Sequence, residues 1–556
     1  MNPKRLASLA CVLSVFAALV VLPGRSHTQS NGPVNSAGRI LPADAAPIER
    51  QVVRFMSPEP RSLDSSINDY DTESTIIPFD PLLRRDEHWV PGPGAADSFE
   101  SSEDGKIWTF QLRPGAKWSD GRPVTAHDFV YSYRRMIDPE EANPYGGFYY
   151  DIKNAQAINR GDIADLSELG IRAVDDLTLV IETEKAAPYL PYIVSFGNAF
   201  PVPKWQVEKY DRKWTLLENI VSNSGFKLGE WVNGSYMTFV PDPNYNGPHK
   251  PYLEKVIHPF REASTATILP YENSEVDIEI VDITDLDRIE KDPDLSRDLV
   301  KVAARGSWYL FFKTKQPPFD DIRVREALAR AINREAICRI ILRGTAVPGY
   351  SMIPPEFGEY SGDDLKSLQN FEPDTGKRLM REAGFPNGRG FPRQEMWLRA
   401  PSPTINLVGQ AITNMLKENL GIDITIRSAD RTMYMNDLYN WRMNLGFIVF
   451  YADYLDPRNM LDMIWHSQAK GYSRSDWSNT DFDRLVEEAA AELDMGRRGQ
   501  LYRQAERIMV EDYAGAFLYH PVNLELRKPW IRGYSTNPSG ISGSIDYTQI
   551  YVSNEP

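Results

Sequence analysis

Short apolar runs and helix-like runs alternate between residues 395 and 450, and this order limits the possible folds more than any other feature of the chain. Strands that alternate with helices normally form a parallel sheet through right-handed connections. The strand-like runs are residues 395–398, 422–426 and 445–450, and the helix-like runs are residues 404–420 and 433–441. The pattern predicts an α/β fold with a doubly wound parallel sheet in the C-terminal half.

Ligands of such sheets bind outside the carboxyl ends of the strands. In this chain those ends are followed by the loops 399–403, 427–430 and 451–453. We therefore predict a crevice at this edge of the sheet, and we expect Asp453 to face it.

Two carboxylates, Asp453 and Asp456, follow directly behind the apolar strand. Both need partners, because burying an unpaired charge costs several kcal/mol. Asp456 precedes Pro457, an arrangement typical of a helix N-cap. Asp453 lies too early in the chain for the same cap. From the residues alone, a salt bridge to an arginine and a role in ligand binding are both open for it.

The first half of the chain is rich in strand-like segments, at residues 107–112, 177–182 and 236–240. A helix is predicted from Ala126. Tyr149 lies with three other aromatic residues in the glycine-containing segment 144–151, which is typical of a loop. These rings either line a cavity or pack on their own domain. Residues 308–312 predict a further strand, with a helix capped by Asp320 or Asp321 behind it.

The composition narrows the class of protein. The chain is 42% hydrophobic and 25% charged, which is typical of globular domains, and its formal net charge of −15 opposes binding to nucleic acid. Residues 1–28 have a basic start and an uncharged apolar run, and they predict an export signal. We favour cleavage over retention as an anchor, and Cys11 lies inside the apolar run, which argues against a lipoprotein. Residues 29–48 are small, polar and broken by prolines, and we predict a flexible tail there.

No catalytic or metal-binding motif is found in the sequence. Phosphate-binding loops, paired metal-ligand histidines and the G-x-S-x-G nucleophile motif are all missing, and the seven histidines are scattered. We expect no cofactor and no metal. Without Cys11 the thiol of Cys338 has no partner for an internal disulfide, and its helix-like apolar surroundings predict a buried, inert group.

Six segments together resemble the extracytoplasmic oligopeptide-binding proteins of ABC importers, which form solute-binding family 5. Each is modest alone, but they follow in the right order over almost the whole mature chain. The segments are 79-FDPLLRRDEHW-89, 107-IWTFQLRPGAKWSDGRPVTAHDFVYSYRRMIDP-139, 200-FPVPKW-205, 316-QPPFDDIRVREALARAINRE-335, 450-FYADYLDP-457 and 528-KPWIRGY-534.

The resemblance implies a bilobed periplasmic-binding-protein fold with three domains and two lobes. One lobe has a discontinuous core domain, with a further domain inserted in it, and the other lobe contains the doubly wound sheet. Hinges are expected near Arg305 and His520. The predicted bounds are 49–80 with 200–305 and 521–556 for the core domain of the first lobe, 81–199 for the extra domain, and 306–520 for the second lobe.

The resemblance also implies site residues. The family pairs the ammonium of an extended peptide with an aspartate in an A-D-Y segment, and Asp453 matches that position. Charge-assisted hydrogen bonds of this kind are worth ~1.5–3 kcal/mol each. We expect the peptide backbone to pair with strand edges near 308–310 and 450–452. The predicted ligand-binding residues are Asp453, Tyr451, Phe450, Ala452, Trp308, Tyr309, Tyr149, Arg399 and Arg427.

The chain departs from the family in two respects. Well-studied relatives carry a disulfide where this chain has residues 306–307 and 450–451. Relatives also supply cations for the peptide carboxylate, whereas the strand before Tyr451 is uncharged, so Arg399 and Arg427 are candidates by position only. Peptide length and the contact to the peptide carboxylate therefore stay open.

The expected partners are an oligopeptide and the permease subunits of an ABC importer, and we expect a monomeric, non-enzymatic protein in the periplasm. An oligosaccharide or metal-chelate receptor of the same fold is the main alternative. A secreted hydrolase that uses paired carboxylates, and a chaperone-like or signalling receptor, are further alternatives.

Overall fold

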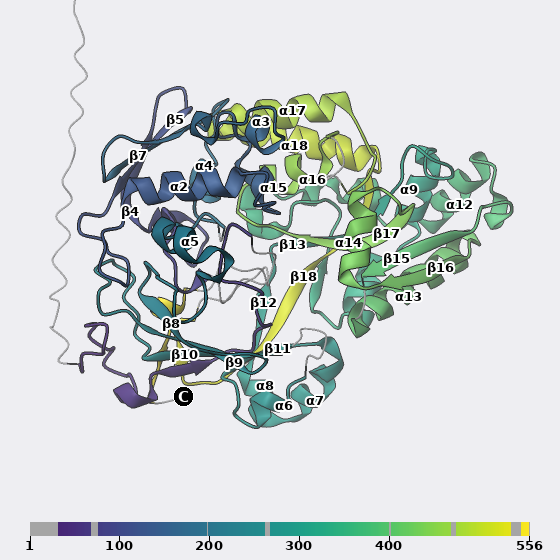
Figure 1. The fold of residues 1–556 in the computed structure, drawn as a ribbon. Coiled ribbons are helices and arrows are strands. Elements are labelled where there is room, and N and C mark those ends of the chain that lie inside the picture. Colours follow the sequence, from purple (N-terminus) through teal and green to yellow (C-terminus); the bar gives the residue numbers. More distant parts are fainter. Residues whose placement is uncertain are drawn as a thin grey trace, which may run out of the picture.

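The computed structural model describes residues 32–67, 76–196, 198–261, 267–399, 402–468, 474–534 and 546–554. The predicted export signal at residues 1–28 lies outside these ranges. Figure 1 shows the long strand β18 (Gly515–Arg527) in the middle of the molecule, between the strands β8–β10 and the strands β15–β17.

Two four-stranded sheets form the N-terminal part of the molecule. The first sheet has the order β1 (Val52–Arg54), β10 (Lys255–Pro259), β9 (Tyr236–Pro241), β8 (Phe226–Val232). The second sheet has the order β4 (Ala96–Ser101), β5 (Ile107–Leu112), β7 (Thr178–Glu182), β6 (Ile171–Ala173) and is antiparallel. The strands predicted at 107–112, 177–182 and 236–240 are confirmed.

Helix α2 (Ala126–Ile137) packs against the second sheet and begins at the predicted residue. The Asp128 carboxylate accepts a hydrogen bond from the Thr125 backbone N–H at 2.7 Å. This bond satisfies a backbone donor that the first helical turn leaves without a partner.

Residues 278–527 contribute an eight-stranded sheet, called the large sheet below. Its strand order is β11-β18-β13-β17-β15-β16, and β12 and β14 also pair with β18. Its first members are β11 (Ile278–Val281), β12 (Leu299–Ala303), β13 (Gly306–Phe312) and β14 (Ala346–Pro348). Residues 515–519 of β18 pair with β13, whereas residues 522–527 pair with β11 and β12. One strand therefore crosses the predicted domain bound between residues 520 and 521.

The remaining strands carry the alternation seen in the sequence, namely β15 (Gln394–Arg399), α13 (Pro403–Leu420), β16 (Ile424–Ala429), α14 (Arg431–Tyr439) and β17 (Leu445–Tyr451). Strand β15 pairs in parallel with β16 and with β17, so the predicted parallel unit is confirmed. Strand β13 pairs antiparallel with β17. The large sheet is consequently mixed, with a parallel part at one end.

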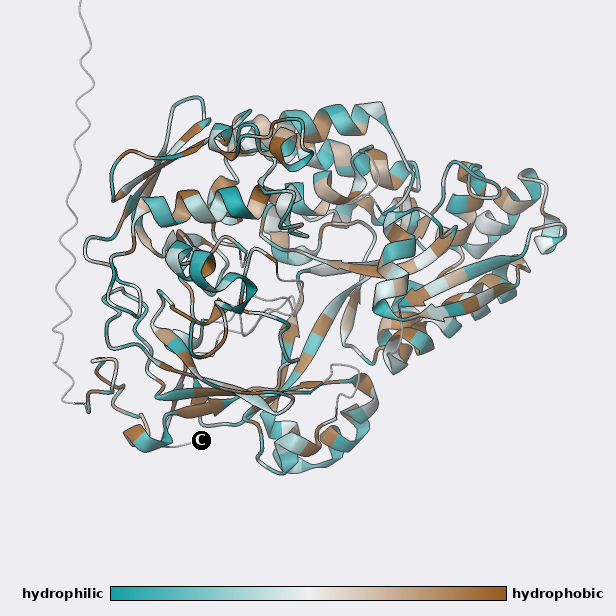
Figure 2. Ribbon diagram, viewed as in Figure 1, coloured by the Kyte–Doolittle hydropathy of each residue, from teal (hydrophilic) through white to brown (hydrophobic). Residues whose placement is uncertain are grey.

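Helices cover both faces of this part of the large sheet. On one face Leu310 and Phe447 belong to the same buried cluster as residues of α9 (Ile322–Arg330) and α13. On the other face Tyr309 and Ile448 belong to the cluster that contains residues of α14 and α16 (Asp462–Trp465). Burial on both faces explains why the strand sequences are continuously apolar instead of alternating. In Figure 2 the helices show both hydrophilic and hydrophobic residues along their length, as helices on the outside of a core do.

The predicted flexible tail is wrong for its described part, residues 32–48. The Asn35 side chain is buried and donates to the Pro251 carbonyl at 2.7 Å, and the Arg39 guanidinium lies 3.3 Å from the centre of the Tyr252 ring. The Ala46 N–H donates to the Val552 carbonyl. Small polar residues are fixed in position here because their side chains form hydrogen bonds with backbone groups elsewhere in the chain, such as the Pro251 carbonyl.

The aromatic rings of the loop 144–151 pack mainly on their own domain, and the Phe148 ring also lies edge-on to Tyr454, with 6.5 Å between ring centres. The loop forms a 3-10 turn, η2 (Gly146–Tyr149), and Phe148 stacks on Phe196 with 5.2 Å between ring centres. The Tyr149 ring lies edge-on to Tyr133 and is 1% exposed. Of the two possibilities for these rings, the packing alternative is the one that the structure has.

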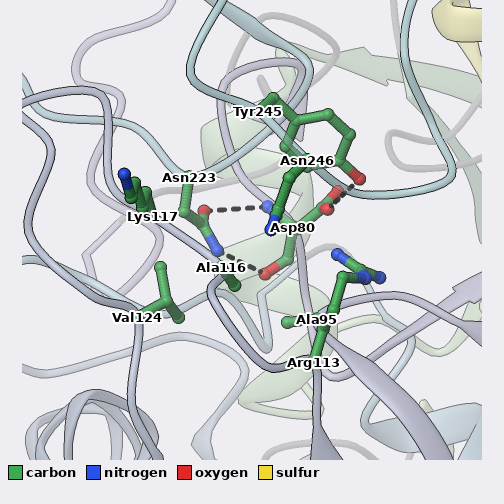
Figure 3. Close-up of a pocket in the computed structure, with 9 residues that line it drawn as sticks. All are labelled: Asp80, Ala95, Arg113, Ala116, Lys117, Val124, Asn223, Tyr245 and Asn246. Atoms are coloured by element: carbon green, nitrogen blue, oxygen red, sulfur yellow. Dashed lines mark hydrogen bonds between the residues drawn. The ribbon is translucent and has the colours of Figure 1, made fainter.

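A polar cluster connects Asp80 with Asn223, just before β8, and with Tyr245, just after β9 (Figure 3). The Asp80 backbone exchanges two hydrogen bonds with the Asn223 side chain, and its carboxylate accepts from the Tyr245 hydroxyl at 2.7 Å. Arg84 forms an ion pair with the same carboxylate at 2.5 Å. Because the Asp80 carboxylate already has both partners, the narrow pocket beside it is structural.

Candidate functional site

The candidate site lies at the edge of the large sheet where β15, β16 and β17 end. The sheet opens at this edge, since β15 pairs with β17 only at residues 445–447. Residues 448–451 of β17 have no strand on that side among the described residues. Residues 308–310, in contrast, pair with β17 on one side and with β18 on the other. The expected backbone pairing of a ligand at 308–310 is therefore wrong, because that strand has no free edge.

Asp453 follows β17 directly and is 5% exposed. Its backbone N–H donates to the Asn459 side chain at 2.8 Å, and its Oδ2 accepts from the Asn459 amide at 3.0 Å. Within the described ranges its Oδ1 accepts no hydrogen bond and no ion pair reaches the carboxylate. One oxygen of this buried carboxylate therefore has no hydrogen-bond donor among the described residues.

Two arginines, Arg85 and Arg474, lie near this carboxylate without forming an ion pair with it. Arg85 comes from β2 (Leu83–Arg85), and its guanidinium donates to the Asp453 backbone carbonyl at 2.5 Å. Its other donors reach the Ser195 hydroxyl and the Tyr192 carbonyl. Burial raises the pKa of Asp453 to about 6, although the Asn459 hydrogen bond and the charges of Arg85 and Arg474 act in the opposite direction. The pKa of Arg85 is lowered to about 10, mainly by burial.

Asp456 is a structural residue, as the sequence predicts. Its Oδ1 accepts from the Arg458 N–H at the start of α15 (Pro457–Met460), which confirms the N-cap. Both of its oxygens also accept from the buried Arg498 guanidinium, at 2.6 and 2.8 Å. The bidentate pair leaves no acceptor on Asp456 for a ligand.

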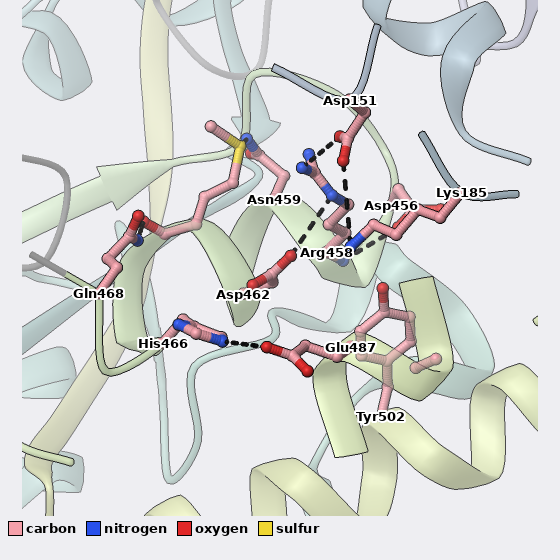
Figure 4. A network of polar contacts seen from close by, with 12 residues as sticks. Asp151, Lys185, Asp456, Arg458, Asn459, Asp462, His466, Gln468, Glu487 and Tyr502 are labelled. Carbon is pink, nitrogen blue, oxygen red and sulfur yellow. Dashed lines mark hydrogen bonds and ion pairs between the residues drawn. The ribbon is translucent and has the colours of Figure 1, made fainter. Parts of the chain in front are cut away.

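Arg458 joins this loop to the second-sheet region, as Figure 4 shows. Its guanidinium pairs with Asp151 at 2.6 Å and with Asp462 at 3.4 Å, and Lys185 lies 4.0 Å from Asp151. The Tyr454 ring, beside Asp453, stacks on Tyr192. The edge of the large sheet is therefore in direct contact with residues 151–192, which belong to the other predicted lobe.

The structure distributes the remaining predicted residues over different environments. Tyr309 is fully buried against Trp465 and Phe517, and Tyr149 is buried as well, so neither ring faces open space. Trp308 is half-buried and packs on Phe447 and Tyr519. Phe450 and Ala452 are buried beside the site, whereas Tyr451 is half-buried at the end of its strand.

The two arginines suggested by position lie in different settings. Arg399 is the last residue of β15 and lies half-buried at the site edge. Arg427 stacks on Trp397, with 4.2 Å to the ring centre, and pairs with Glu395 at 3.3 Å on an exposed surface. Only Arg399 belongs to the group of residues around the strand ends.

Sequence reasoning missed Arg85, Asn459 and Arg474. Arg85 lies inside a segment that carries the family resemblance, and that position was a usable signal. Asn459 lies six residues after Asp453, but its contact requires the turn at α15. Arg474 lies far along the chain, and no local pattern marks it.

The Tyr451 ring packs closely against β13, at the place where the family resemblance implies a disulfide in relatives. Gly306 is its register partner on β13, and a Cβ on Gly306 would lie 2.5 Å from the Tyr451 ring. The missing side chain of Gly306 therefore makes room for the ring. Cys338 is a buried free cysteine with a pKa raised to about 12 by burial, in agreement with the predicted inert thiol.

No helix in the described ranges combines the length and the apolar character needed to cross a membrane. The same ranges contain no group of three or more residues arranged to hold a metal ion.

Curated relatives match over almost the whole chain. The periplasmic oligopeptide-binding protein OppA of Salmonella typhimurium is 29% identical over 524 residues, which cover 92% of this chain and 94% of the relative. The periplasmic murein peptide-binding protein MppA of Escherichia coli is 30% identical, with 88% and 91% covered. The probable deoxycholate-binding periplasmic protein YgiS of Escherichia coli is 28% identical, with 89% and 92% covered.

Solved structures agree with these relatives. An oligopeptide-binding protein of Borrelia burgdorferi has a TM-score of 0.78 at 27% identity and covers 90% of this chain and 99% of its own. Haemophilus influenzae OppA in complex with the peptide RPPGFSPFR has a TM-score of 0.76 at 25% identity, with 91% and 99% covered. The bilobed α/β fold expected from the sequence is thereby confirmed.

The family model for bacterial extracellular solute-binding proteins, family 5, matches residues 90–472, which is more than half of the chain. The family and the relatives are named for solute binding, which supports a binding protein over the hydrolase alternative. This chain belongs to the bacterial extracellular solute-binding proteins of family 5.

Proposed function

We propose that this protein binds peptides with a free amino terminus in the cleft between its lobes, and that Asp453 receives the peptide ammonium. One observation carries the proposal: a buried carboxylate at the carboxyl end of the parallel strands has an oxygen without a partner in the described chain. Relatives named for oligopeptide binding, including one solved with a bound peptide, support a peptide as the solute.

The chemistry of the Asp453 environment suits an ammonium. The Asn459 amide holds the side chain by one oxygen, so the other oxygen has a fixed direction. Arg85 and Arg474 stabilise the ionised form from a distance, yet no cation occupies the place of the ligand. An incoming ammonium then replaces lost hydration with a charge-assisted hydrogen bond.

Closure of the lobes follows from the same geometry. Asp453 belongs to the large sheet, whereas Arg85, which donates to its carbonyl, belongs to the other lobe. A ligand at Asp453 therefore contacts residues of both lobes only in the closed state, and binding shifts the population toward that state.

The experiment compares Asp453→Asn with the natural protein in calorimetric titrations of a free tripeptide and its N-acetyl form. We expect both the substitution and the acetylation to weaken binding at least about tenfold, because each removes one charge of the pair. Asp437→Asn, an acid paired with Arg442 at 3.0 Å, is the matched control and leaves binding unchanged. Equal affinity of Asp453→Asn and the natural protein for the free peptide would refute the proposal.

A solute without an amine is the second candidate, and the similarity to YgiS, which is named for deoxycholate, favours it. Such a ligand would bind Asp453→Asn and the natural protein with the same affinity. It has no amine, so the comparison with an N-acetyl form applies to the peptides only. Titration of deoxycholate alongside the peptides separates the two candidates.

Delivery to an ABC permease in the periplasm, by a monomer, completes the proposal. Family membership and the periplasmic relatives support the transport role and the location. Stimulation of ATP hydrolysis by a reconstituted permease, in the presence of peptide only, is the measurement that tests it.

A further inference from the structure

The Trp89 ring lies between two guanidinium groups. The Arg85 guanidinium lies 5.3 Å from the centre of the ring, and the Arg305 guanidinium lies 4.6 Å from it. A cation within about 6 Å of a tryptophan face is attracted to it, and the attraction grows where water is excluded. The ring is 2% exposed, so it attracts Arg305 strongly although it offers no hydrogen bond.

A tight turn holds this ring in place. The Asp86 Oδ1 accepts from the backbone N–H groups of His88 and Val90, each at 2.8 Å. Trp89 is buried between these two exposed residues and has a φ of +67°, which residues with a side chain rarely adopt. Such a conformation persists only where the surroundings determine it firmly. The turn fixes the ring, so only the longer Arg305 side chain is free to change its partner.

Arg305 lies at the predicted hinge, between β12 and β13. Its backbone is held, because its carbonyl accepts from the Ala452 N–H at 2.7 Å. Its side chain is not held in this way. In the part of the chain that the structure describes, its Nε and Nη1 are buried and have no hydrogen-bond partner. Buried donors without a partner are unfavourable, so the guanidinium gains free energy if it reaches an acceptor.

Glu356 offers such an acceptor. It belongs to η8 (Pro355–Tyr360), and its buried Oε2 accepts no hydrogen bond from the described residues. Burial raises the pKa of Glu356, and the charge of Arg305 opposes this shift, which requires the two groups to lie near each other. A cation and an anion with complementary free atoms are therefore neighbours, yet no ion pair joins them within the described ranges.

The two partners of Arg305 lie on opposite sides of the predicted hinge. The sequence analysis assigns Trp89 to the extra domain at 81–199 and Glu356 to the second lobe at 306–520. A rotation that separates the lobes takes Trp89 away from Arg305, whereas Glu356 stays with the lobe that begins directly behind Arg305. The stack on Trp89 therefore needs the lobes together, but an ion pair with Glu356 does not.

We propose that Arg305 is a hinge switch, which stacks on Trp89 in the closed form and pairs with Glu356 in the open form. The proposal rests on the closure of the lobes in the proposed function. It adds a control of affinity that needs no contact with the solute, because competition between the two partners sets the population of the form that binds.

Two variants should shift this population in opposite directions. Glu356→Gln removes the competing anion, so the Kd of trialanine should fall about threefold. Trp89→Leu removes the aromatic face, so the Kd should rise about threefold. Pentaalanine should show the same two factors in calorimetric titrations. Small-angle X-ray scattering of the empty proteins should show a smaller radius of gyration for Glu356→Gln and a larger one for Trp89→Leu.

A third variant tests whether Arg305 carries the effect. Without its guanidinium neither partner matters, so Glu356→Gln added to Arg305→Gln should change neither the Kd nor the radius of gyration. The matched control is Glu382→Gln, which removes an acid from an exposed pair with Arg378 in α12 (Pro373–Glu382) and should leave both quantities unchanged. If Trp89→Leu does not fold, Glu356→Gln with and without Arg305 still decides the question.

The outcomes separate the switch from the proposed function. A Kd and a radius of gyration of Glu356→Gln equal to those of the natural protein would refute the switch, and so would an equal effect of Glu356→Gln in the absence of Arg305. If Asp453→Asn still weakens peptide binding, the proposed function stands in either case. If no peptide binds, the proposed function is refuted, and scattering of the empty variants alone decides on the switch.

Discussion

Asp453 and Asp456 lie three residues apart in one loop, yet their carboxylates have opposite surroundings. Asp456 is paired with Arg498 through two hydrogen bonds and caps α15. Asp453 has a single amide partner and a pKa raised to about 6. The first arrangement stabilises the fold, whereas the second leaves a buried acid poorly compensated.

The pH dependence of binding follows from the pKa of Asp453. Its ionised fraction falls from about nine-tenths at pH 7 to about one-tenth at pH 5. Since only the carboxylate attracts an ammonium, the Kd for a free tripeptide should rise about tenfold over this range. Titrations in buffers of different ionisation enthalpy should detect proton release near pH 6, and Asp453→Asn should show no such release. A Kd that is constant between pH 5 and 7 would contradict this assignment.

The same raised pKa determines the direction in which the stability of the folded protein changes with pH. The folded, empty protein binds the proton of Asp453 more tightly than the unfolded chain does, whose pKa is about 3.9. The contribution of Asp453 to the free energy of unfolding is therefore fully present below about pH 4, and it is lost as the pH rises through about 6.

Substitution of the two acids should separate stability from binding. Asp456→Ala leaves the Arg498 guanidinium buried and unpaired, which lowers the free energy of unfolding by about 3–5 kcal/mol. Asp453→Asn removes an unfavourable buried charge, so the melting temperature of the empty protein should stay equal or rise at pH 8. Thermal melting of both variants without ligand checks the prediction. A similar loss of stability in both would show that Asp453 is structural too.

The strand end and the parallel crossover fix the position of Asp453 within a few residues, whereas its role as the ammonium site comes from the family resemblance and stays a prediction. Sequence reasoning could not reach Asn459 or Arg474, whose contacts depend on the turn at α15 and on packing between distant segments. Arg427 was a candidate for the same reason as Arg399, namely its position after a strand-like segment. The pairing register of β15 and β16 instead places Arg427 beside Glu395, in an exposed ion pair.

At the scale of elements, the pairing of β13 with β17 supports the open strand end. Gly306 is opposite Tyr451, and a Cβ there would lie 2.5 Å from the ring and 3.0 Å from the Phe450 carbonyl oxygen. The sequence predicted both strands but not this antiparallel pairing, because no local signal specifies which distant strand is the neighbour. The missing Gly306 side chain is thus a requirement of the tertiary structure.

Gly306→Ala should push these strands apart at the site. We expect a loss of stability of about 1–3 kcal/mol and a weaker affinity for peptide, because Tyr451 and Phe450 must move. Gly92→Ala, where a Cβ meets no atom within 4 Å, is the control with unchanged melting. If Gly306→Ala melts and binds like the control, the close approach is not rigid.

At the scale of the molecule, the ion pair of Arg458 and Asp151 connects residues that the sequence analysis assigns to different lobes. Both side chains are largely buried, at 9% and 12% exposure, so solvent weakens this pair little. Under the proposed closure of the lobes, such a contact favours the closed form, and it acts on all ligands alike.

Asp151→Asn should therefore lower the affinity for every peptide by a similar factor of about fivefold, because a neutral hydrogen bond replaces a charged one. Small-angle X-ray scattering should show a larger radius of gyration for the empty variant. Glu182→Gln, in an exposed pair with Lys153 inside one lobe, is the control and leaves both quantities unchanged. Affinity lost for one peptide length only would contradict a general effect on closure.

Strand β18 has a consequence for how the chain reaches this state. It lies between β11 and β13 in the large sheet, yet it begins at residue 515 of 556. All residues up to Gly515 must be made before the strand that completes the sheet begins. Until then the edges of β11 and β13 stay uncovered, and exposed edges of this kind invite aggregation. A truncation that removes the last forty or so residues should leave an insoluble product instead of a smaller working receptor.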